Sequence, residues 1–217
     1  MTTTRDGIAS ERVADALRGA ILRGEFAPGT RIRQEEVASD HGASRLPVRE
    51  ALRMLEAEGL VTLVANTGAW VSRLSLGECD ELYQIRERIE PLLLRYSIPN
   101  LDESAVAHLD ELAAEMEKIR DVERFLELDR EFHLASYAGA DTLLLGDTVS
   151  RLWNSTQHYR RLYSRGLDDD GNRIVHDEHH MLVRAIEMRD SDDAERVLLG
   201  HIRRTRLELA RHPEIFA

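Results

Sequence analysis

The chain has 217 residues, with 40 acidic against 29 basic side chains and a formal net charge of −11. Its single cysteine excludes an internal disulfide, and no apolar stretch approaches the length of a membrane span or of a signal-peptide core. These features favour a soluble, cytoplasmic protein that contacts no membrane and exceeds one average domain.

The charge is unevenly distributed along the chain. Residues 1–75 carry ten basic and ten acidic side chains, whereas residues 76–217 carry nineteen and thirty. The acidity therefore belongs to the C-terminal part, which the phosphates of a nucleic acid would repel. We predict two domains with the boundaries 1–75 and 76–217.

The first segments of the chain predict two helices and a turn. An amphipathic pattern covers about residues 9–23, and GEFAPG at 24–29 then breaks the chain. The run Gln34–His41 predicts a second, supporting helix, which Gly42 closes. A third helix follows directly, so this region predicts a helix-turn-helix.

The third helix begins after Ser44, which we expect to be its N-cap, and Pro47 lies in its first turn. Arg45, Arg49 and Arg53 recur every four residues along one face. The opposite face is apolar, with Val48, Leu52 and Leu55. A helix with an apolar back and a cationic front suits the DNA major groove, although the same pattern is common on solvated helices.

After Gly59, the segment LVTLVANTGAWVSRL alternates like two short strands, with Asn66-Thr67-Gly68 as the tip of a hairpin. Three helices followed by a β-hairpin make a winged helix-turn-helix. The wing would lie along the phosphate backbone.

The string PGTRIRQEEVASDHGASRLPVREALRMLEAEGLV resembles the N-terminal domain of GntR-family transcription regulators over about residues 9–74. Leu46 departs from the family pattern, which usually has threonine there. The resemblance makes Arg45 and Arg49 the principal DNA contacts, and leaves open which arginine reads bases. It also implies that Ser44, Thr67 and Gly68 approach the DNA backbone or the minor groove. Arg33 and Arg53 would be supporting phosphate contacts.

The remainder of the chain predicts helices throughout. Helical patterns cover roughly 77–97, 102–119, 121–138, 141–165, 171–189 and 191–211, and no strand alternation is visible. Six helices in this length can form a compact antiparallel bundle. The fold class is therefore mostly α, a winged helix-turn-helix of three helices plus a β-hairpin followed by an all-α six-helix bundle.

A carboxylate and three imidazoles form a second constellation. Asp129 and His133 lie four residues apart, so both project from one helix face, and His179 and His201 fall in later helices. This donor set suits zinc first, with nickel, manganese or iron as alternatives. Taken separately, the pair is weak evidence for a metal site, and distant histidines are most often ordinary surface or core residues.

The segments DREFH and EHHMLVRAIEMRDSDDAERVLLGHI resemble the FCD domain that follows GntR-type winged helices. The resemblance implies that Asp129, His133, His179 and His201 bind the metal, and its register selects His179 over His180. It also implies a small carboxylate effector at the metal, assisted by Arg86 of the first bundle helix. Tyr83, His176 and Arg160 are further candidates to line that site.

Arg86 has an equally good alternative, an ion pair within its helix to Glu90, worth only ~0.3–0.5 kcal/mol if exposed.

Together these patterns predict a homodimeric repressor, not an enzyme, that binds a pseudo-palindromic double-stranded operator. A small organic acid would modulate its affinity. Two alternatives stay open: a metal-dependent hydrolase, and a helical domain that only dimerises, each fused to a DNA-binding module.

Overall fold

A computed structural model describes residues 5–166 and 169–216 of the chain. Its internal contacts divide the chain into two units, Met1–Leu74 with Arg151–His158, and Ser75–Ser150 with Tyr159–Ala217. Among the described residues no helix is long and apolar enough to cross a membrane.

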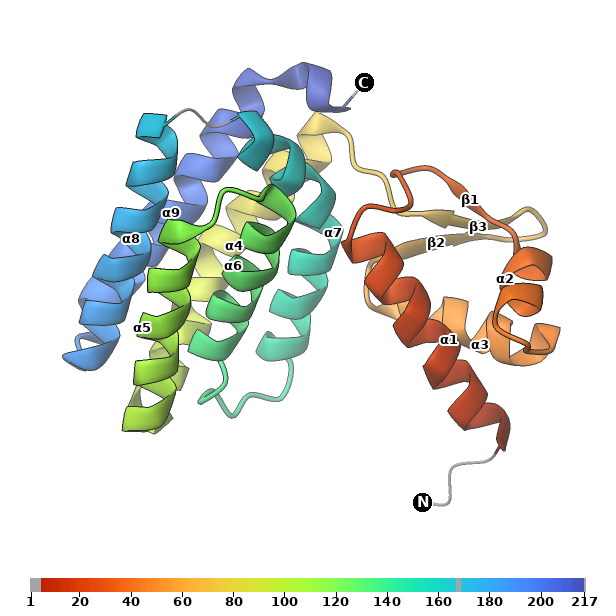
Figure 1. The fold of residues 1–217 in the computed structure, drawn as a ribbon, viewed down its shortest axis with the longest axis horizontal. Helices are drawn as coiled ribbons and strands as arrows, with labels where there is room; N and C mark the ends of the chain where they lie inside the picture. The colour runs from red at the N-terminus through yellow and green to blue at the C-terminus, as the bar shows by residue number, and fades with distance from the viewer. Residues whose placement is uncertain (1–4, 167–168, 217) are drawn as a thin grey trace. The chain divides into compact units, whose positions relative to one another are not determined.

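The N-terminal unit is a winged helix-turn-helix (Figure 1). Helices α1 (Arg5–Leu22), α2 (Gln34–Asp40) and α3 (Arg45–Ala57) are followed by strands β2 (Val61–Val64) and β3 (Gly68–Val71). The sequence missed strand β1 (Arg31–Ile32), which pairs antiparallel with β3 and makes the sheet order β1-β3-β2. Two residues are too few to show an alternating pattern, so only tertiary pairing defines this strand.

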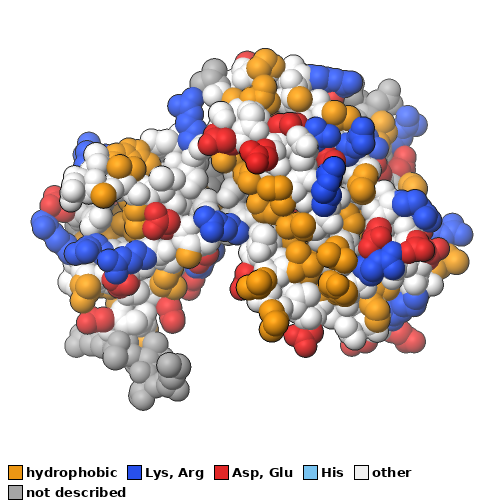
Figure 2. Space-filling model, turned by 180° about the vertical axis from the view of Figure 1, so that it is seen from behind, with side chains coloured by type: hydrophobic (Ala, Val, Ile, Leu, Met, Phe, Trp, Pro, Cys, Tyr) orange, Lys and Arg blue, Asp and Glu red, His pale blue; other side chains and the backbone are white. Residues whose placement is uncertain are grey.

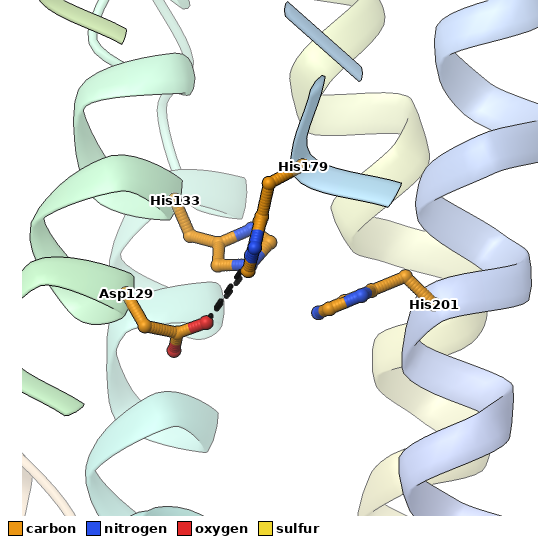
Figure 3. Close-up of side chains that lie close together, drawn as sticks. All are labelled: Asp129, His133, His179 and His201. Carbon is orange, nitrogen blue, oxygen red and sulfur yellow. Dashed lines mark hydrogen bonds and ion pairs between the residues drawn. The ribbon is translucent and has the colours of Figure 1, made fainter. Parts of the chain in front are cut away.

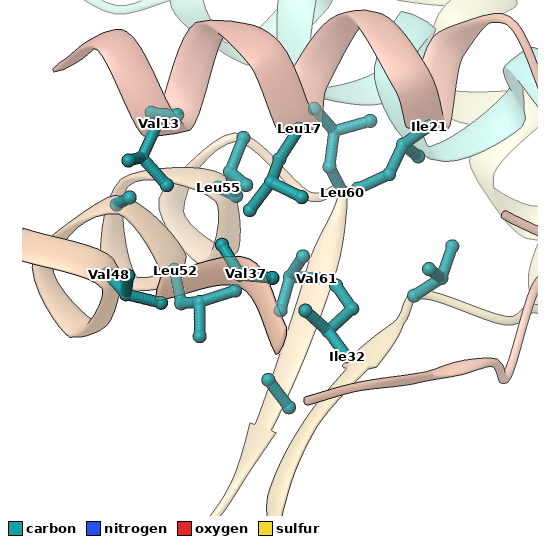
Figure 4. Close-up of a cluster of buried hydrophobic side chains, with 14 residues drawn as sticks. Val13, Leu17, Ile21, Ile32, Val37, Val48, Leu52, Leu55, Leu60 and Val61 are labelled. Atoms are coloured by element: carbon teal, nitrogen blue, oxygen red, sulfur yellow. The ribbon is translucent and has the colours of Figure 1, made fainter. Parts of the chain in front are cut away.

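One apolar core holds the helices of this unit against its sheet (Figure 4). Val13 and Leu17 of α1 meet Leu52 and Leu55 of α3, and all four are at most 3% exposed. These α3 residues belong to the apolar face expected from the sequence. Because that face is buried, the arginine face of the same helix points outward.

The turn between α2 and α3 has the expected backbone but not the expected side-chain bond. Gly42 has φ +57°, a left-handed backbone conformation in which a residue with a side chain would be strained. Ser44 occupies the N-cap position of α3, yet its hydroxyl makes no capping hydrogen bond. The Ser44 side chain is exposed and accessible to a ligand at the start of the helix.

The C-terminal unit is the expected helical bundle. Its helices are α4 (Leu76–Ser97), α5 (Glu103–Lys118), α6 (Val122–Ser136), α7 (Leu145–Gly166), α8 (Asp169–Glu187) and α9 (Ser191–Arg211), with short 3-10 turns at Ile98–Asn100 and Pro213–Phe216. Side-chain caps fix several starts: Ser75 and Glu78 form a reciprocal capping box on α4. The interior is mostly apolar, but it also contains buried charged and polar side chains.

Candidate nucleic-acid interface and candidate metal centre

The arginine face of α3 lines an open groove of about 740 Å³ in the N-terminal unit. The start of α2 and the tip of the wing form its other walls. Six of the seven DNA contacts expected from the sequence line this groove: Arg33, Arg45, Arg49, Arg53, Thr67 and Gly68. Ser44 is exposed beside it at the N-terminus of α3. Figure 2 shows Lys and Arg side chains gathered over this unit.

Several of these arginines already have acidic neighbours. Arg45 donates to Glu35 at 2.6 Å, and Arg33 donates to Glu36 at 2.9 Å. Both pairs are more than 60% exposed, so each contributes little stability and can exchange its carboxylate for a phosphate. Arg49, in contrast, forms no ion pair in the described part of the chain, so no carboxylate has to be displaced before it contacts a phosphate or a base.

A further arginine, which the sequence analysis did not single out, lies beside the wing tip. The Arg31 guanidinium donates to the Thr67 carbonyl oxygen at 3.0 Å and lies 5.7 Å from the Trp70 ring centroid. Gly68 has φ 141°, which a residue with a side chain rarely adopts. Arg31 lies in strand β1, which the sequence did not reveal. Its position beside the wing could therefore not be predicted from the sequence.

The second constellation converges in the middle of the bundle (Figure 3). Asp129 and His133 project from α6, His179 from α8 and His201 from α9, and one ligand-type atom of each lies within 4.8 Å of the others. The His179 Nε2 atom is 3.3 Å from Asp129 Oδ1 and 3.4 Å from His133 Nε2. Three different helices thus bring together the four residues predicted from spacing and resemblance.

The protonation of these groups suits a metal ligand set. Burial lowers the pKa of both His133 and His179, so their neutral forms, which donate a lone pair, are favoured. Burial alone would raise the pKa of Asp129, but Arg160 and the two histidines outweigh it and hold the carboxyl well below its usual range. Asp129 therefore offers an anion, and His133 and His179 offer neutral imidazoles, to a divalent cation.

A carboxylate fixes the orientation of the fourth ligand. His201 Nδ1 lies 2.9 Å from Glu178 Oε2, and Glu178 also forms an ion pair with Arg204. The carboxylate accepts a hydrogen bond from the Nδ1–H group, which leaves the Nε2 lone pair directed at the cluster. Glu178 and His201 are on different helices, so nothing in their spacing revealed this contact.

The structure also places the four residues expected to line an effector site. The Arg160 guanidinium contacts Asp129 directly. Arg86 pairs with Glu90 in α4, the alternative foreseen from the sequence, and the guanidinium lies 4.8 Å from the ring centroid of buried Tyr83. His176 is half-buried, edge-on to Phe125 at 5.9 Å, and is not one of the four clustered residues.

One part of that expectation was wrong. The Arg86–Glu90 pair is not an exposed helix-surface pair, because its side chains are 2% and 0% exposed. Tyr137 adds a hydrogen bond of 2.9 Å from its hydroxyl to Glu90 Oε2. A buried, hydrogen-bonded ion pair has a large desolvation cost, unlike the surface pair that the helical spacing suggested.

Comparisons with known proteins agree with both halves of this structure. Residues 9–71 match bacterial regulatory proteins of the gntR family, and residues 81–204 match the FCD domain. The chain belongs to the GntR family of transcription regulators. Its relatives are regulators rather than enzymes, which argues against the hydrolase alternative.

Two relatives and one solved structure show the extent of the similarity. An uncharacterized HTH-type transcriptional regulator of Streptomyces ambofaciens is 30% identical, over 93% of this chain and 86% of its own. The HTH-type transcriptional repressor RspR of Escherichia coli is 27% identical, over 89% and 85%. E. coli McbR/YncC shares the fold with a TM-score of 0.81 at 22% identity, over 94% of this chain and 98% of its own.

Proposed function

We propose that this GntR-family regulator is a homodimeric repressor. A small carboxylate that binds at a divalent metal centre would control its affinity for the operator. The observation that carries this proposal is the buried cluster of one carboxylate and three imidazoles inside the FCD domain. Zinc is the first candidate for the ion, with nickel, manganese and iron as the alternatives.

The chemistry of the cluster supports a resident cation. Without an ion, three imidazoles and a carboxylate would lie at close range in the interior, and the Nδ1 atom of His179 has no hydrogen-bond partner among the described residues. A divalent ion there would be held by the Nε2 atoms and by Asp129, and Arg160 would keep the carboxylate in place. When bound, the ion supplies positive charge for a carboxylate that the acidic domain would otherwise repel.

The metal proposal is tested by replacing ligands and matched histidines. Elemental analysis of purified protein should show about one ion per chain, which the double variant His179→Ala, His201→Ala loses. His180→Ala is the control, since His180 neighbours His179 but faces Glu117 at 3.6 Å. Equal metal content in all three proteins would contradict the site.

An exposed apolar band on the C-terminal unit supports the proposal of a homodimer. Helices α4 and α9 pack along each other, and their outer faces carry apolar residues 39% to 50% exposed: Ile85, Leu92, Tyr96, Leu199 and Leu207. Figure 2 shows a continuous band of apolar side chains on the C-terminal unit. Such a patch is unusual for a monomer, and a twofold dimer would present two readers to a palindromic site.

Sedimentation measurements test this interface. Leu92→Glu should shift the protein toward monomer, because it places a charge in the centre of the band. Leu143→Glu is the matched control, since Leu143 is 96% exposed in the α6–α7 connection and outside the band. A dimer that tolerates Leu92→Glu as well as Leu143→Glu would refute the proposed surface.

One relative supports the proposed direction of regulation. RspR is described as a repressor, and we infer repression that the effector relieves. An effector acts only through its affinity difference between two states, so a coupling of ~1–3 kcal/mol is the expected scale. Operator affinity measured with and without a bound acid tests this, and an acid that binds without changing operator affinity would contradict it.

A further inference from the structure

A second buried polar group lies beside the metal centre. We call Tyr83, Arg86 and Glu90 of α4, together with Tyr137 at the end of α6, the distal polar group. All four are at most 6% exposed. Tyr137 connects it to the metal centre, since its ring lies 6.4 Å from the His133 ring and its hydroxyl donates to Glu90 at 2.9 Å.

The charges of this group cancel before any ligand binds. Arg86 contacts Glu90, and on the other side Arg160 contacts Asp129, so the four buried charges form two neutral pairs. A divalent ion at the four-ligand cluster would add positive charge that neither of these two pairs compensates. An anionic ligand group therefore finds its partner at the metal end and not at Arg86.

One polar atom of the distal polar group lacks a partner. The Tyr83 hydroxyl is buried with no hydrogen bond to any described residue, although the whole side chain is only 1% exposed. A buried hydroxyl without a partner is costly, and it can both donate and accept. An uncharged hydroxyl or carbonyl of a ligand would satisfy it.

We infer that the effector is a monocarboxylate with an uncharged hydroxyl or carbonyl at its other end, that Tyr83 reads this neutral group, and that dicarboxylates are rejected. The inference rests on the proposed function, because it assumes a carboxylate at the metal. A second carboxylate would lie near Glu90, whose arginine is already paired, and like charges brought together in a buried site are strongly unfavourable.

Calorimetric titration of the zinc-loaded full chain tests this with acids of equal length. The probes are butyrate, 4-hydroxybutyrate and succinate, with their six-carbon counterparts hexanoate, 6-hydroxyhexanoate and adipate. In at least one length series the hydroxy acid should bind about tenfold more tightly than both the unsubstituted acid and the diacid.

Two variants assign the discrimination to named atoms. Tyr83→Phe should remove the advantage of the hydroxy acid and leave the unsubstituted acid unaffected. Glu90→Gln removes the carboxylate that pairs with Arg86 and should strengthen diacid binding about tenfold. Glu208→Gln, which opposes the exposed Arg211, is its control.

The outcomes separate the two proposals. A diacid that binds wild-type protein more tightly than the hydroxy acid overturns the inference and leaves the metal-linked sensor standing. The same holds if Tyr83→Phe retains the full preference with unaltered thermal unfolding. If no acid of either series binds the zinc-loaded protein, the inference and the carboxylate effector both fail.

Discussion

The contact between Glu178 and His201 makes a quantitative prediction about metal affinity. Glu178 is a residue of α8 whose carboxylate lies 2.9 Å from His201 Nδ1, and both side chains are only 12% exposed. We predict that Glu178→Gln weakens zinc binding even though Glu178 never touches the ion. The amide can still accept a hydrogen bond, but it carries no charge and orients the imidazole less firmly.

The expected size follows from the bond that changes. A hydrogen bond to a charged group contributes about 1.5–3 kcal/mol, and a neutral one about 0.5–1.5 kcal/mol. The difference, roughly 1–1.5 kcal/mol, corresponds to about a tenfold loss of affinity. Glu178→Ala removes the acceptor completely and should approach the upper end of the roughly 10–100-fold range known for such outer partners.

Competition with a chromophoric chelator measures the zinc affinity, and nitrogen chemical shifts of labelled histidine report which His201 nitrogen carries the proton. Glu178→Asp keeps the charge but shortens the reach, so it separates the hydrogen bond from the field of the carboxylate. Glu117→Gln is the matched control, because Glu117 faces His180 outside the cluster. Unchanged affinity and an unchanged His201 tautomer in Glu178→Gln and Glu178→Ala would refute the reasoning.

Three further changes have calculable effects. Arg49→Ala should weaken operator binding by ~1–3 kcal/mol in a fluorescence anisotropy titration, and an affinity equal to wild type would exclude Arg49 as a base contact. Leu52→Ala should lower the free energy of unfolding by ~2–5 kcal/mol, because Leu52 is 1% exposed in the winged-helix core; a denaturant midpoint within error of wild type would contradict this. Burial lowers the folded-state pKa of His133 and His179, so stability is fully present above their unfolded pKa of about 6.5 and is lost below it, by up to about 1.4 kcal/mol per pH unit for each. Denaturant unfolding of metal-free protein at pH about 7.5 and 5.5 measures this, and equal stability at the two values would show that the two sites are not neutral when folded.

The sequence was most informative where the spacing of residues along a single helix was enough to predict which face each residue lies on. The alternation of arginine with Val48, Leu52 and Leu55 determined which side of α3 is buried, because a period of 3.6 residues separates two faces whatever the partner helix is. The Asp129–His133 spacing likewise placed two candidate ligands on one face of α6. The boundaries of the bundle helices followed from their breaks, since turn residues act locally.

Tertiary structure decided every contact between segments remote in the chain. Strand β1 exists only because Arg31 and Ile32 pair with β3, and a two-residue segment has no pattern of its own. Spacing alone could not show that Glu178 meets His201. Nor could it show that Arg86 and Glu90 are buried, since helical spacing is the same for a solvated pair and a desolvated one.

The sequence by itself therefore determined the two-part organisation, the outward arginine face and the four candidate ligands. Each of these depends on local periodicity or on a pattern shared with relatives. Only the folded chain decided that the four ligand atoms lie within 4.8 Å of one another, and that an acidic residue orients one of them. Distances between helices depend on how their side chains pack, and that packing is a property of the assembled bundle rather than of any one segment.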